Sequence, residues 1–127
     1  MRFMMMIKAT KDYEAGLPPS PELMAGMAKL TEDNVKSGAL LASGGLQPSS
    51  QGLRIRYSGG KRTVIDGPFA ETKELIGGYA IISANSKAEA IELANRVLEV
   101  HVNARVAEFE IEIRPLFYDE HFSPAQK

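Results

Sequence analysis

The sequence contains no cysteine and only two histidines, His101 and His121. The absence of thiols excludes disulfides, cysteine nucleophiles and zinc–thiolate sites, and two isolated histidines give no reason to predict a metal site. Acidic and basic residues nearly balance, 16 against 15, for a net charge of −1. Binding to nucleic acids or to anionic membranes requires clustered positive charge, so we expect neither partner.

Long hydrophobic runs are also absent. Residues 1–7 resemble the start of a signal peptide, but their apolar run ends at Lys8, too early for the core of such a peptide. No stretch approaches the roughly 20 apolar residues of a membrane span, and we expect a cytoplasmic protein. The 127 residues match the size of one compact domain. We assign that domain to residues 1–118 and expect a polar C-terminal tail at residues 119–127.

Two helices are marked by their capping residues. Ser20, with a proline directly after it, is typical of a helix start, and Gly38 is typical of a helix end. These signals predict a helix over Pro21–Ser37. Residues 86–89 have the sequence of a capping box and predict the start of a second helix. The buried stripe of that helix is expected to contain Ile91, Ala94, Val97 and Leu98.

Alternating or continuous apolar residues predict six strands. These are Arg2–Ala9, Leu40–Leu46, Leu53–Tyr57, Thr63–Ile65, Tyr79–Ala84 and Glu108–Leu116. Gly59 and Gly60 predict a tight turn that joins the third and fourth strands in a hairpin. The first and fifth strands are apolar on both faces, so each should be covered on two sides.

The order strand, helix, several strands, helix, strand predicts an α+β fold, the ferredoxin-like α/β sandwich. Two helices can cover only one face of such a sheet, whereas Met4 and Met6 point to the other face. A second copy of the chain is the simplest cover, with sheet packed on sheet across a two-fold axis. We therefore expect a homodimer.

One stretch carries a family resemblance. Residues 58–61 (SGGK), residues 64–74 (VIDGPFAETKE) and the pair Gly78-Tyr79 are similar to the DGPF-domain branch of the YCII-related proteins, and the similarity runs from the first strand to about Phe117. The resemblance implies a dimeric α/β-barrel of ferredoxin-like subunits. It also implies that related domains are sometimes fused to sigma factors of the extracytoplasmic-function class, and that much of the family has no assigned biochemistry.

Some YCII-related members use a histidine on the first helix together with an aspartate as an acid/base pair, and one branch dehydrochlorinates an aromatic diol. The predicted first helix, Pro21–Ser37, contains no histidine. His101 lies at the end of the second helix and His121 in the tail. The histidine–aspartate chemistry therefore does not carry over, and the resemblance leaves open whether this chain is an enzyme.

Asp66 is the candidate catalytic residue, because a carboxylate at a strand end beside a glycine can act as a general base when it is buried. The alternative is that Asp66 opens a turn by binding backbone N–H groups. The candidate ligand-binding residues are Phe69, Glu71, Lys73 and Tyr79. Glu71 and Lys73 could equally belong to a solvated loop, and Tyr79 could simply pack its ring.

Two pairs of like charges alternate along predicted strands. Arg54 and Arg56 share one strand face, and Glu110 and Glu112 share another. Cross-strand ion pairs between them are the simpler expectation. The alternative is a polar cleft between subunits that binds a small anionic or phenolic molecule.

These observations leave two main hypotheses for function. The first is an enzyme or binding protein with a small-molecule site in a cleft of the homodimer. The second is a noncatalytic interaction module linked to transcription regulation, and a purely structural dimer is a third possibility. The glycine pairs at residues 44–45 and 59–60 lack the strand–loop–helix setting of a phosphate-binding loop, so we predict no cofactor.

Overall fold

The computed structural model describes residues 1–71 and 74–117 of the chain, so the predicted tail and His121 lie outside the described residues. The helices are α1 (Lys11–Glu14), α2 (Pro21–Ser37) and α3 (Lys87–Asn103), and Ser49–Gln51 form a 3-10 turn, η1. The strands are β1 (Arg2–Lys8), β2 (Leu40–Gly45), β3 (Leu53–Ser58), β4 (Lys61–Asp66), β5 (Ile76–Ser83) and β6 (Ile111–Pro115). The predicted α+β class is confirmed.

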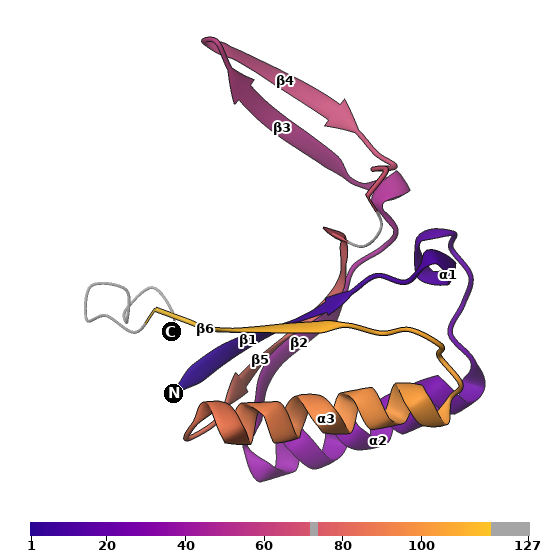
Figure 1. Ribbon diagram of the computed structural model, residues 1–127, viewed down its shortest axis with the longest axis vertical. Helices are drawn as coiled ribbons and strands as arrows, with labels where there is room; N and C mark the ends of the chain where they lie inside the picture. The colour runs from indigo at the N-terminus through magenta and orange to yellow at the C-terminus, as the bar shows by residue number, and fades with distance from the viewer. Residues whose placement is uncertain (72–73, 118–127) are drawn as a thin grey trace.

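Four strands form the main sheet in the order β2-β5-β1-β6, and every neighbouring pair is antiparallel. This strand order, with α2 after β1 and α3 after β5, agrees with a ferredoxin-like sandwich. Helices α2 and α3 lie along one face of the sheet (Figure 1). None of the helices in the two described ranges is long and apolar enough to cross a bilayer.

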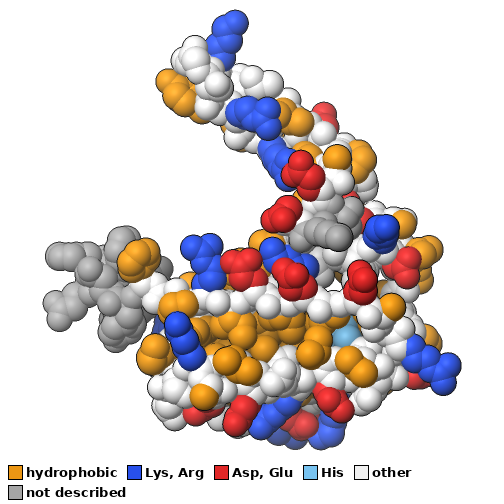
Figure 2. Space-filling model, in the orientation of Figure 1, with side chains coloured by type: hydrophobic (Ala, Val, Ile, Leu, Met, Phe, Trp, Pro, Cys, Tyr) orange, Lys and Arg blue, Asp and Glu red, His pale blue; other side chains and the backbone are white. Residues whose placement is uncertain are grey.

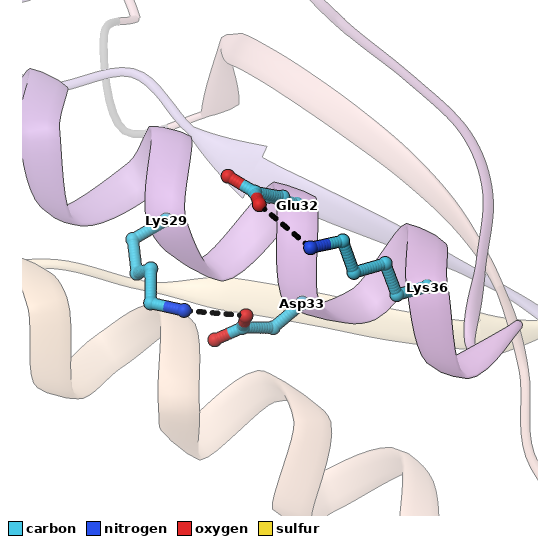
Figure 3. A network of polar contacts seen from close by, with 4 residues as sticks. All are labelled: Lys29, Glu32, Asp33 and Lys36. Carbon is cyan, nitrogen blue, oxygen red and sulfur yellow. Dashed lines mark hydrogen bonds and ion pairs between the residues drawn. The ribbon is translucent and has the colours of Figure 1, made fainter.

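The bounds of α2 are those that the sequence predicts. The Ser20 hydroxyl accepts a hydrogen bond from the Leu23 N–H at 3.1 Å. Gly38 ends the helix with φ at +82°, a left-handed conformation that costs glycine little. The outer side of α2 carries two exposed i,i+4 ion pairs, Lys29–Asp33 at 2.8 Å and Glu32–Lys36 at 2.9 Å (Figure 3). That side of the helix layer is therefore suited to solvent.

Helix α3 begins as predicted but is rotated relative to the expected stripe. The Ser86 hydroxyl caps the Glu89 N–H at 3.2 Å, and the Glu89 carboxylate accepts from Asn85 Nδ2 at 3.3 Å. Ile91 is 53% exposed, so its assignment to the core was wrong. The buried residues of α3 are Ala90, Leu93, Ala94 and Val97. Small alanines in this stripe suit close packing against the sheet.

The core lies between the helices and one face of the sheet, as the hydrophobic side chains in Figure 2 show. Phe3 and Met5 of the central strand β1 are its largest fully buried side chains. At the end of α3 the half-buried His101 ring stacks on Phe109, with 3.7 Å between ring centroids. His101 Nδ1 lies 2.8 Å from the Val97 carbonyl oxygen and can reach it only by donating a proton.

The opposite face of the sheet has no helix on it (Figure 1). Strand alternation places Met4 and Met6 of β1 on this face, beside Ile81 and Tyr79 of β5. All four side chains are half-buried, and we call this surface the open face. Toward β6 it becomes polar, where Lys8 pairs with Glu112 at 3.3 Å. The described chain therefore leaves an apolar strip uncovered on the centre of its sheet.

Strands β3 and β4 form the predicted hairpin, with φ of +57° at Gly59 and +78° at Gly60 in the tight turn. The hairpin is a separate two-stranded sheet that projects from the body on the side of the open face (Figure 1). We call residues 53–66 the arm. Because the arm is not part of the main sheet, the expected cross-strand pairing of Arg54 and Arg56 with the β6 glutamates was wrong. Sequence alternation does not reveal which sheet a hairpin joins.

The first prediction concerns His101. Burial lowers the pKa of His101 below its ordinary value of 6.5, although the Val97 carbonyl partly opposes the shift. The unfolded chain then binds this proton more readily, so the stabilisation is present above pH 6.5 and is lost as the pH falls through the folded pKa. Urea denaturation between about pH 8 and about pH 5 should show a loss of stability that is smaller in His101→Gln. An identical pH dependence in both proteins would contradict this role.

Candidate functional site

A hollow of about 310 Å³ lies where α1 meets the segment that follows β2. It is lined by Tyr13, Gly16, Leu17, Gly45, Leu46, Gln47 and Pro48. The Tyr13 hydroxyl donates a hydrogen bond to the Leu46 carbonyl and so ties α1 to the end of β2. The volume is at the low end of the range for small-molecule sites, and the lining is largely apolar. The hollow is therefore a candidate subsite for a small ligand.

Next to this hollow, Glu14 of α1 holds Ser49 of η1 through both of its carboxylate oxygens. Glu14 Oε1 accepts the Ser49 backbone N–H and Oε2 accepts the Ser49 hydroxyl, each at 2.6 Å. The Ser49 hydroxyl oxygen in turn accepts the backbone N–H of Phe69 at 3.0 Å. Hydrogen bonds to an ionised carboxylate are short and strong. Three segments that are distant in sequence are thereby joined at one serine, and we call this junction the arm root.

Gly67 completes the arm root because no larger residue fits there. Its N–H donates to the Gly52 carbonyl at 2.9 Å. A Cβ at residue 67 would lie 1.8 Å from the carbonyl oxygen of Ser49, which is far inside van der Waals contact. The sequence analysis did not foresee this close backbone approach. Glycine is needed at residue 67 because of the close contact with η1. Backbone conformation does not require it, because Gly67 is not among the residues with positive φ.

One side of the arm is fastened at its base by an aromatic contact. The Arg54 guanidinium lies 3.8 Å from the centroid of the Phe69 ring, in a cation–π contact. Arg54 is paired with Ile65 across the hairpin, and both Ile65 and Phe69 are half-buried. This side of the arm therefore packs on the loop that follows β4, and the arm has a defined direction relative to the body.

The structure brings two of the predicted site residues to the arm root. Asp66 ends β4 opposite Leu53, and Phe69 follows two positions after Gly67. The exposed Asp66 carboxylate has no hydrogen bond or ion pair to any residue of the described ranges. The turn-opening alternative fails for a simple reason, because residue 68 is a proline and has no N–H to donate.

The other predicted site residues are dispersed. Glu71 is exposed in the loop after the arm, and Lys73 lies outside the described residues. Tyr79 is on the open face, where its ring crosses Gly44 so closely that a Cβ at residue 44 would lie 2.9 Å from the Tyr79 hydroxyl. A second, more polar hollow of about 460 Å³ lies between the end of α2 and the start of α3. Its lining includes Asn85, Glu92 and Arg96 but none of the predicted site residues.

Sequence reasoning missed Glu14 and Ser49. Both lie in stretches with no motif, and they are 35 positions apart, so no spacing rule connects them. Only the fold of the segments around η1 brings them together. Among the residues that the structure describes, no group of three histidine, aspartate or glutamate side chains is arranged to hold a metal ion.

The Ser49 junction generates a prediction on stability. Ser49→Ala leaves the Phe69 N–H and one Glu14 oxygen without their partner, so it should lower the free energy of unfolding by about 1–3 kcal/mol. Ser50→Ala is the matched control, since Ser50 is exposed and should be neutral. Urea denaturation of both variants measures the difference. Equal stability of the two would show that the junction is not needed for the fold.

A second prediction follows from the close approach at Gly67. Gly67→Ala should destabilise the protein by about 2–3 kcal/mol, because the new methyl group overlaps backbone atoms that cannot move independently. Gly52→Ala is the control: its φ is −106° and its Cβ would lie 3.5 Å from the Ser49 oxygen, an ordinary contact. That variant should be neutral or more stable by less than about 1 kcal/mol. Thermal unfolding of the two alanine variants would contradict the steric account if Gly67→Ala were the more stable.

Comparison with known proteins gives two findings. The family model described as "YCII-related domain" matches residues 1–111, which include β1 to the start of β6. An uncharacterized protein of Rhizobium meliloti (strain 1021) is 33% identical over 94 residues, covering 74% of this chain and 73% of that relative. The region that the family model matches contains β1, β2 and β5 of the main sheet, both long helices and the arm. The chain therefore belongs to the YCII-related family.

Proposed function

We propose that this protein is a cytoplasmic homodimer of the DGPF-domain branch, and that it binds a small anionic or phenolic molecule in a cleft completed by the second copy. The open face is the observation that carries the proposal. Met4 and Met6 lie on the central strand of the sheet, yet no element of the described chain covers them. A second sheet packed face to face is the simplest cover for such a surface.

The helix layer supports this assignment by contrast. The outer side of α2 carries the two exposed ion pairs of Figure 3, which suit contact with water. The open face instead presents methionine, isoleucine and tyrosine at its centre, with charge at the two ends of β1 and along β6. Association through the open face therefore buries apolar area and leaves the paired charges in solvent.

The proposed ligand site lies along the seam between the arm root and the open face. Asp66 is available there as a hydrogen-bond acceptor for a ligand hydroxyl, because its carboxylate has no partner within the described ranges. The other candidate ligand-binding residues are Phe69 at the arm root, Tyr79 on the open face, Glu71 and Lys73. Lys73 is the candidate that would pair with an anionic or phenolate group.

Catalysis by Asp66 at this site would require more than binding of a ligand. A general base must lie within hydrogen-bond reach of the proton that it removes and must be shielded from bulk water. Asp66 is exposed in the single chain, so catalysis by Asp66 depends on its being covered by the second copy and by the ligand. Binding comes first in this proposal, and any transformation follows from it.

The second candidate function is the noncatalytic interaction module linked to transcription regulation. The exposed apolar side chains of the arm favour it, because such patches mark protein interaction surfaces. The two functions differ in their dependence on Asp66. Ligand binding requires that carboxylate, whereas a docking surface on the arm does not.

The test is a thermal-shift titration with hydroxybenzoate, catechol and phosphate. A ligand at about ten times its Kd should stabilise the wild type by about 1.4 kcal/mol and raise its Tm by several degrees. Asp66→Asn should lose most of this shift. Asp33→Asn, which changes an exposed carboxylate on the outer side of α2, should retain it.

Sedimentation velocity over a dilution series tests the dimer in the same samples. We expect a dimer that loses its fold when it dissociates, because the open face would then be exposed to water. A stable folded monomer would refute the dimer. A dimer with no ligand shift, or with a shift that Asp66→Asn retains, would refute the ligand site and favour the interaction module.

A further inference from the structure

We propose that the apolar face of each arm packs on the other copy of this chain, beside the contact made by the open face. We call this contact of the arm the clasp. This inference rests on the proposed homodimer and assigns a partner surface to a part of the chain that the dimer proposal leaves unused. It concerns the β3–β4 hairpin beyond its root.

The arm has two unlike sides. Cross-strand pairing places Leu53, Ile55, Tyr57 and Val64 on one side, together with Asp66 and Arg62. The four apolar side chains of that set are between 57% and 71% exposed. The other side carries Arg54, Arg56 and Thr63, and Phe69 covers its base. The apolar side is thus largely exposed and lies opposite the side that the Arg54–Phe69 contact fastens.

An isolated two-stranded hairpin is marginally stable in water. This one is held at its root by Ser49, Gly67 and the Arg54–Phe69 contact, and beyond the root it stands clear of the body (Figure 2). A root fixed by short hydrogen bonds gives the arm a defined direction. An exposed apolar face on an arm of defined direction is typical of a protein interaction surface.

The direction of the arm identifies the partner. The arm rises on the open-face side of the sheet, away from α2 and α3 (Figure 1). A second copy seated on the open face must therefore lie alongside it. Strands of six residues extend about 20 Å, whereas the outer strands of a four-stranded sheet are about 14 Å apart. The arm is long enough to cross the flank of the second copy.

The distribution of charge favours the body of the second copy, rather than its arm, as the surface that the arm contacts. Four basic residues and one acidic residue give residues 53–66 a net charge of +3. The whole chain carries −1, so the remainder carries −4. Two arms in contact would repel each other, whereas an arm against a body is attracted. Glu108 and Glu110, both exposed before and at the β6 edge, are acidic groups that the second copy offers.

The chain's own C-terminal segment is a poorer candidate for covering the arm. The arm follows β2, at one edge of the sheet, and starts near the Lys8 end of β1. Leu116 follows β6, at the opposite edge, and donates its N–H to the Arg2 carbonyl at the other end of β1. The last described residues therefore leave the sheet at the corner diagonally opposite the arm root.

The absence of cysteine allows a direct test with spin labels. Labels are placed at Ile55→Cys, on the apolar side, and at Thr63→Cys, on the opposite side of the same arm. At concentrations where the protein is a dimer, the label at residue 55 should be immobilised and the label at residue 63 should stay mobile. A double variant, Ile55→Ser with Val64→Ser, should raise the dimer Kd at least about tenfold, while Thr63→Ser leaves it unchanged.

The outcomes separate the clasp from the dimer. If both labels are equally mobile in a dimer whose Kd the double variant does not change, the clasp is refuted and the dimer stands. If the wild type is a monomer throughout, the dimer and the clasp are both refuted. If the label at residue 55 is immobilised only on addition of duplex DNA or of another protein, the arm has a different partner and the clasp is refuted.

Discussion

The architecture depends on one constraint: two helices cover a single face of a four-stranded sheet. Phe3 and Met5 fill the covered side of β1, and Met4 and Met6 alternate with them on the other side. A strand with five consecutive large apolar residues at the centre of a sheet requires burial on both faces. The helix layer can satisfy only half of that requirement, because both long helices lie on the same face of the sheet. The open face is therefore a property of the fold as much as of any particular residue.

The hydrogen bonds of the arm root tie the arm to the body. A strand, a 3-10 turn and a return loop would ordinarily give a mobile hairpin, since loops carry few contacts. Here one carboxylate, that of Glu14, binds both the amide and the hydroxyl of Ser49, and Ser49 binds the return loop at Phe69. The contact at Gly67 leaves no room for the two sides of the root to slide past each other. Local hydrogen bonds thus set the direction of a structure some 14 residues long.

The sequence predicted what local chemistry determines. The limits of α2 follow from Ser20 and Gly38, the start of α3 from Ser86, and the hairpin turn from Gly59 and Gly60, and all were confirmed. The predicted buried stripe of α3 was one position off at Ile91, because Ala90 is the buried residue there. Helical periodicity defines a buried stripe less exactly than a capping residue defines a helix end. α1, where Thr10 caps the Tyr13 N–H, was not predicted, because a single helical turn leaves almost no periodic signal.

The candidate site was predictable only in part, for a related reason. The DGPF stretch directed attention to Asp66 and Phe69, and the structure places both at the arm root. Their partners Glu14 and Ser49 come from other segments, and a contact across 35 residues has no local sequence signal. Net charge was misleading in the same way. A value of −1 does not reveal how charge is distributed, and the fold separates a basic arm from an acidic body. A chain whose opposite charges lie on separate parts is electrostatically complementary to its own copies, so near neutrality here favours self-association.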